Sequence, residues 1–103
     1  AASLVMKSLA LGGRYKEKDA YDLFYLVRHY QQGPASAAEA LRPLLHLPVV
    51  QQARKNLQEA FGSLRATGPA WVANFRDLTE PRARDIQIAD VYKTFERFFQ
   101  LLL

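Results

Sequence analysis

The first candidate for chemistry is a carboxylate in unusual surroundings. Asp22 stands within the run Tyr21-Asp22-Leu23-Phe24-Tyr25-Leu26, which is otherwise apolar or aromatic. Such a segment is expected to be buried, and a charge left in an apolar interior without a partner costs several kcal/mol. Carboxylates whose pKa is shifted by burial and by neighbouring charges often serve in catalysis or ligand binding. We therefore single out Asp22, with Asp19 and the nearby Lys7 as the other candidates.

A purely structural interpretation of the same residues stays open. Asp19 has the residue type to cap the start of a helix, where its side chain accepts hydrogen bonds from free backbone N–H groups. Asp22 has two cationic neighbours that can neutralise it, Arg14 and Lys18, and Lys18 stands at the i, i+4 spacing that favours helical ion pairs.

Metal binding has little support in the sequence. The two histidines, His29 and His46, fall on different predicted helices, and neither belongs to a recognised ligand pattern. Structural metal sites normally need about four ligands. We therefore predict no metal site, and the sequence also lacks a nucleophile elbow and a phosphate-binding glycine loop.

Two helices must position these residues. Apolar spacing predicts a first helix over 3–11, ended by Gly12, with Lys7 on its polar side. A charged loop is expected over 13–18, and a second helix from Asp19 to Tyr30, whose first turn holds both aspartates. On that helix Asp22 lies beside the core-facing stripe.

The remaining sequence predicts only helices. Helical spacing of apolar residues, with proline breaks, indicates further helices around 36–43, 48–64, 69–78 and 82–102. No alternating run long enough for a strand appears. The prediction is a single all-α domain over 1–103, a compact bundle of about five or six helices without a sheet.

Composition limits the function classes. The 103 residues are 50% hydrophobic, contain no cysteine, and carry a net charge of +4. Disulfides and thiolate metal sites are excluded, and a reducing, cytoplasmic compartment is the default expectation. We expect a soluble chain without a membrane span. The basic excess is compatible with nucleotide or nucleic-acid partners, although the arginines are scattered.

One stretch resembles a known family. Met6–Leu11, then Arg14, then Lys18–Leu26, is similar to the C-terminal half of AbiEii/AbiGii-type nucleotidyltransferases, the bacterial toxins of abortive-infection and toxin–antitoxin systems. In that family a lysine on a helix is followed, past a basic loop, by a basic-Asp-x-x-Asp-Leu-aromatic segment. Only residues 6–26 carry the specific part of the resemblance.

The resemblance implies roles for individual residues. Lys7 would contact nucleotide phosphates, Asp22 would be the late catalytic aspartate, and Asp19 is the fallback assignment for it. Arg14 would be a supporting phosphate or carboxylate contact, and Lys18, the basic residue before the first aspartate, would be a further nucleotide-binding residue. The implied reaction is transfer of a nucleotidyl group from a nucleoside triphosphate, with Mg²⁺ bridging phosphates and carboxylates.

The sequence also departs from the family pattern. The family's catalytic core carries, on a β-sheet before this region, a Gly-Ser motif and paired metal-binding acidic residues, and nothing in these 103 residues supplies that sheet-borne set. We therefore expect the helical portion alone, inactive by itself, with Mg²⁺ and nucleotide bound only when a core is supplied.

Several partners follow as hypotheses. An uncovered apolar patch near Leu4, Leu9 and the Asp19 helix would favour a homodimer. A nucleotidyltransferase core or an antitoxin-like protein is the expected hetero-partner. The alternative function is an independent helical interaction module in which the basic loop and the aspartates are only structural, and nucleic-acid binding through the arginines is a third hypothesis.

Overall fold

The C-terminal helix α6 (Pro81–Leu102) is the longest element, and helices from most of the chain pack against it. The computed structural model describes residues 2–102. Helical spacing places Val91, Phe95, Phe98 and Leu102 on one face of α6, and all four are buried. The predicted amphipathic helix over 82–102 is therefore confirmed, and it begins one residue earlier than expected.

The other elements of residues 2–102 are also helical, with no strand. In chain order they are α1 (Ala2–Ala10), α2 (Lys16–His29), α3 (Pro34–Leu41), the 3-10 turn η1 (Arg42–Leu44), α4 (Pro48–Phe61) and α5 (Thr67–Phe75). The helices α3, α4 and α6 each begin with a proline. The backbone N–H groups of a first turn have no partner within the helix, so the missing N–H of proline breaks no helical hydrogen bond there. The predicted all-α bundle of five or six helices is confirmed.

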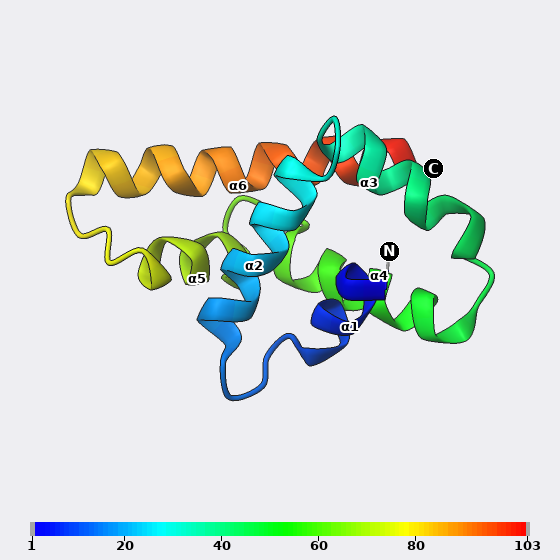
Figure 1. Cartoon of the computed structure of the whole chain (residues 1–103). Coiled ribbons are helices and arrows are strands. Elements are labelled where there is room, and N and C mark those ends of the chain that lie inside the picture. The colour runs from blue at the N-terminus through cyan, green and yellow to red at the C-terminus, as the bar shows by residue number, and fades with distance from the viewer. Residues whose placement is uncertain (1, 103) are drawn as a thin grey trace.

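The helices are arranged around α6 and α2 (Figure 1). α5 lies antiparallel to the first half of α6, and α3 packs along the C-terminal half. α2 crosses the bundle and makes its most extensive contact with α5, while α1 packs on α4 and on α2. α1 therefore lies at the periphery, in contact with α4 and α2, and it carries the candidate residue Lys7.

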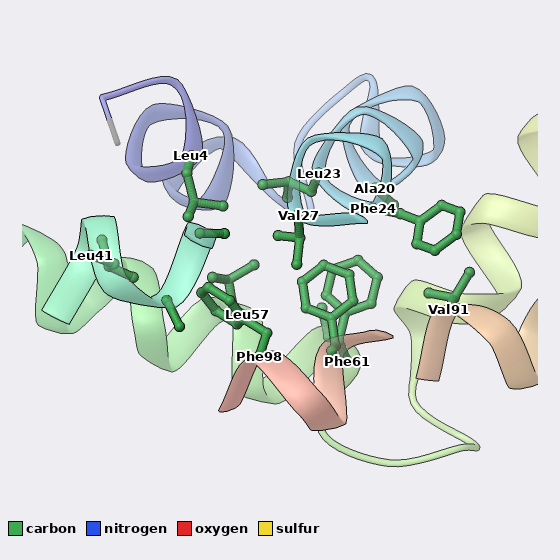
Figure 2. Close-up of a cluster of buried hydrophobic side chains, with 14 of the residues drawn as sticks. Leu4, Ala20, Leu23, Phe24, Val27, Leu41, Leu57, Phe61, Val91 and Phe98 are labelled. Carbon is green, nitrogen blue, oxygen red and sulfur yellow. The ribbon is translucent and has the colours of Figure 1, made fainter. Parts of the chain in front are cut away.

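The core is a continuous cluster to which every α-helix contributes. Figure 2 shows Leu23 and Val27 of α2 and Leu4 of α1 directed towards the side chains of α4 and α6. Near its centre the rings of Phe61 and Phe95 stack almost parallel, with centroids 3.9 Å apart. This stack joins α4 to α6.

Hydrogen bonds fix the end of α1. The Ser8 hydroxyl is buried and donates to the Leu4 carbonyl, and the Asn56 amide of α4 donates to the Ser8 carbonyl at 3.1 Å. Gly12 then adopts φ 87°, the left-handed conformation that glycine allows, so the predicted glycine stop is confirmed. The carbonyls at the end of a helix need such partners, so Asn56 helps to hold α1 on α4.

Within residues 2–102, no helix combines the length and the apolar character that crossing a lipid bilayer requires.

Candidate functional site

Lys7, Lys18, Asp19 and Asp22 meet where α1 packs against α2. The Lys7 ammonium lies 3.0 Å from Asp22 Oδ2 and 3.8 Å from Asp19 Oδ1. The Lys18 ammonium donates to the same Asp22 oxygen at 2.7 Å. The carboxylate side chains of Asp19 and Asp22 are 17% and 24% exposed, so both are largely shielded from solvent. The four residues form a neutral network that we call the Lys7–Asp22 cluster.

The start of α2 differs from the sequence prediction. α2 begins at Lys16, and its N-cap position is Tyr15, which makes no side-chain capping hydrogen bond. Asp19 is therefore inside the helix and does not cap it, and Asp22 lies in the second turn instead of the first. Lysine and glutamate are good helix formers, so 16–18 join the helix instead of forming a loop.

The Asp22 carboxyl is held in its ionised form. Partial burial raises its pKa, but hydrogen bonds from Lys18 and Lys7, with their positive charges, outweigh burial and bring the pKa below its ordinary value of 3.8. The same hydrogen bond with Asp22 raises the pKa of Lys18 above 10.5. Both shifts favour the charged forms of Asp22 and Lys18 at neutral pH.

This shift predicts a pH dependence of stability. A lowered folded-state pKa stabilises the protein above pH 3.8, and the contribution is lost as the pH falls through the folded-state value. Asp22→Asn is expected to reduce the free energy of unfolding by about 1 kcal/mol at pH 7 and to have little effect near pH 2. Urea unfolding followed by circular dichroism from pH 2 to 7 measures this difference.

The matched control is Asp85→Asn, because Asp85 is exposed on α6 and makes no ion pair with a residue in 2–102. Its effect on the free energy of unfolding is expected to stay within about 0.5 kcal/mol over that pH range. A difference between wild type and Asp22→Asn that persists unchanged at pH 2 would contradict the electrostatic origin.

Arg14 does not join the cluster. Its guanidinium lies 5.5 Å from the ring centroid of its neighbour Tyr15, and among residues 2–102 it forms no ion pair. Of the two cations proposed to neutralise Asp22, only Lys18 does so. Arg14 instead lines a separate surface pocket of about 340 Å³ together with Lys18 and Phe75.

A second pocket opens directly beside the cluster. It has a volume of about 330 Å³ and is lined by Ser3, Lys7, Tyr21, Asp22, Tyr25 and Leu26. Tyr21 stacks on Phe75 with centroids 5.1 Å apart, and Tyr25 is 55% exposed. The pocket therefore places a cation and a carboxylate next to aromatic rings. We call it the Lys7 pocket.

The two tyrosines were missed as candidate site residues. Tyr21 and Tyr25 are one helical turn apart, and their rings extend a row that continues to His29, with centroid distances of 6.3 and 4.5 Å. Their i, i+4 spacing beside Asp22 was the available signal. That spacing does not by itself distinguish an exposed aromatic row from one that packs in the core.

The carboxylates are too few for a metal site of their own. No group of three or more histidine, cysteine, aspartate or glutamate residues within 2–102 is arranged to hold a metal ion. His29 and His46 are both exposed, and the His46 ring nitrogen Nδ1 lies 3.1 Å from the Pro43 carbonyl oxygen.

Comparison with known proteins adds no identification: no protein-family model, no curated protein and no solved structure matches the chain.

Proposed function

We propose that this chain is the helical C-terminal region of a nucleotidyltransferase-like protein of the toxin type, and that it contributes nucleotide contacts to a catalytic core outside these 103 residues. The observation that carries the proposal is the ion pair between Lys7 and Asp22, 3.0 Å apart at the edge of the Lys7 pocket. These are the two residues to which the AbiEii/AbiGii resemblance gives the lysine and late-aspartate roles, and they come from different helices.

The chemistry of the pocket supports this assignment. Of the three N–H groups of the Lys7 ammonium, one donates to Asp22, which leaves donors for phosphate oxygens, and the Lys7 side chain is 38% exposed. Tyr21 and Tyr25 offer ring faces on which a nucleobase can stack. In the proposal, Asp22 orients Lys7 while Asp19 adds a second negative charge near its ammonium, 3.8 Å away.

The metal and the reaction centre belong to the core in this proposal. Phosphoryl and nucleotidyl transfer need clustered carboxylates that hold Mg²⁺, and residues 2–102 hold no such cluster. The chain alone is accordingly expected to bind a nucleoside triphosphate without turning it over. Its hetero-partner would be a nucleotidyltransferase core, in the same polypeptide or in another, or an antitoxin-like protein.

Nucleotide binding by the wild-type chain tests the proposal. Titration of ¹⁵N-labelled protein with each of the four ribonucleoside triphosphates and Mg²⁺ should produce saturable shifts at Lys7, Tyr21 and Tyr25. Lys7→Met keeps the length of the side chain and removes its charge. It is expected to raise the dissociation constant about tenfold or more, because a charge-assisted hydrogen bond to phosphate is lost.

Lys93→Met is the matched control, since Lys93 is exposed on α6, away from the Lys7 pocket. It is expected to leave the dissociation constant within about twofold of wild type, as surface substitutions distant from a site usually have small effects. Equal binding by wild type and Lys7→Met, with both proteins folded by circular dichroism, would refute the assigned role of Lys7.

A second candidate function is an independent helical interaction module or homodimer. It is favoured by the neutrality of the Lys7–Asp22 cluster, which suits a structural link between α1 and α2. It is also favoured by exposed apolar side chains on α1, with Met6 70% and Leu9 39% exposed, although Leu4 of the expected patch is buried. Under this alternative, sedimentation shows concentration-dependent association and the nucleotide titrations show no saturable shifts.

A further inference from the structure

A pocket on another part of the molecule has a different chemistry. Its volume is about 500 Å³, and it lies where the C-terminal ends of α2 and α5 approach the first half of α6. It is lined by Arg28, Arg76, Leu78, Ala83, Ile86, Gln87 and Asp90. None of these residues belongs to the Lys7–Asp22 cluster, and we call this open surface pocket the Arg76 pocket.

The polar centre of the Arg76 pocket is built from a buried side chain. Gln87 is only 6% exposed, and its Oε1 accepts a hydrogen bond from Arg76 Nη1. This bond fixes the orientation of the amide, because the arginine can only donate. The amide nitrogen of Gln87 makes no hydrogen bond within residues 2–102, and Gln87 lines the pocket. We take its N–H₂ group as the donor that the pocket offers to a ligand.

The charges of the pocket sum to a single positive charge. Arg28 and Arg76 each contribute one positive charge, and Asp90 contributes one negative charge. Arg28 Nη1 lies 2.5 Å from Asp90 Oδ1, but both side chains are more than 40% exposed. Exposed pairs contribute little to stability, and one ion pair leaves most of the five N–H donors of a guanidinium unused. The pocket thus offers donors from two guanidinium groups and one amide, and its one carboxylate already has a partner.

The remaining wall is apolar. Leu78 and Ala83 line it, and Ile86 is 60% exposed although it is a large apolar side chain on a regular helix. Ligand pockets of roughly 300–1,000 Å³ commonly combine such walls with a few convergent polar groups. A net charge of +1 matches a monoanion, and a guanidinium matches a carboxylate through two parallel N–H···O bonds.

From these features we propose that the Arg76 pocket binds a small organic carboxylate with an apolar or aromatic body, held by Arg76 and the Gln87 amide with its body against Ile86. The proposal is independent of the nucleotide-contact function, since it uses other residues on other helices.

Benzoate is a suitable probe, with benzamide as its uncharged counterpart and inorganic phosphate as a plain anion. Titration of the ¹⁵N-labelled full chain with benzoate should shift the Gln87 side-chain amide and the backbone of Ile86 with a dissociation constant on the order of 1 mM. Benzamide and inorganic phosphate are expected to bind at least about fivefold more weakly, because one lacks the charge and the other lacks the apolar body.

Two substitutions with opposite expected effects separate binding from damage to the fold. Arg76→Gln should raise the dissociation constant for benzoate about tenfold or more. Asp90→Asn should lower it roughly two- to fivefold, since the like charge is removed and Arg28 is released. Arg97→Gln, on the exposed side of α6 outside the pocket, is the control and should leave it unchanged.

A lower dissociation constant for benzoate in Asp90→Asn, together with a higher one in Arg76→Gln, supports a carboxylate site. The proposal would be overturned if benzamide and benzoate bound equally well, if only phosphate shifted the amide signals, or if Arg76→Gln bound benzoate as tightly as wild type. Because Asp90→Asn is expected to gain affinity, an unfolded Arg76→Gln protein would still leave the proposal open to refutation by the other variant.

Discussion

Phe61→Ala is expected to lower the free energy of unfolding by about 3–5 kcal/mol, the usual cost of truncating a buried aromatic side chain. Phe61 is fully buried, and its ring stacks on Phe95 with 9° between the ring planes. The substitution removes this contact and leaves a cavity where α4 meets α6. A domain of this size has roughly 5–15 kcal/mol of stability in total, so the loss is a large fraction of it.

Leu64→Ala is the matched control for Phe61→Ala. Leu64 lies three residues further along the chain, and its side chain is 49% exposed. Its truncation is expected to change the free energy of unfolding by less than about 1 kcal/mol. Urea unfolding monitored by circular dichroism at 222 nm measures both variants, and similar costs for the two would show that the Phe61–Phe95 stack is not a centre of stability.

Gly68→Ala is expected to destabilise the protein by about 1–3 kcal/mol through overpacking, although it replaces glycine with the best helix former. Gly68 is buried in the first turn of α5. A Cβ atom at this position would lie 2.5 Å from the Ala60 carbonyl oxygen and 2.5 Å from two carbons of the Phe61 ring. Neither the backbone of α4 nor a ring held in the core can move aside cheaply, so α5 would have to shift.

Gly13→Ala provides the comparison for Gly68→Ala. A Cβ atom there would approach only the Ala10 carbonyl oxygen, at 3.2 Å, and Gly13 does not have a positive φ. We expect a change below about 1 kcal/mol. Thermal unfolding of both variants measures the difference, and a Gly68→Ala protein as stable as wild type would show that α4 and α5 are not closely apposed at this point.

The fold was predictable because each helix carries its own apolar stripe. The side chains that sequence spacing places least well lie at or beyond the end of a helix. The helix expected around 48–64 ends at Phe61, and Leu64, beyond that end, is 49% exposed because helical spacing no longer decides which side chain faces inward there. Phe75 is the last residue of α5 and is 42% exposed, since it covers Tyr21 at the surface instead of entering the core.

The candidate site was predictable in part. The pairing of Lys18 with Asp22 follows from local helical spacing, and it is confirmed. The approach of Lys7 to Asp22 depends on how α1 packs against α2, and residue spacing along one helix does not predict such a contact. The Arg76 pocket could not be predicted, because Arg28 and Asp90 are 62 residues apart and meet only through the packing of α2 and α6.

The division of the Lys7–Asp22 cluster between two helices has a consequence for dynamics. Lys7 belongs to α1, and both aspartates belong to α2. Whenever α1 detaches transiently from α2, Lys7 separates from the two aspartates. A ligand that contacts residues of both helices therefore binds only while α1 is packed on α2. Mass action then makes local opening of α1 rarer by a factor of 1 + [ligand]/Kd. The exchange rate of the α1 amide hydrogens with solvent deuterium would thereby report how much of the site is occupied.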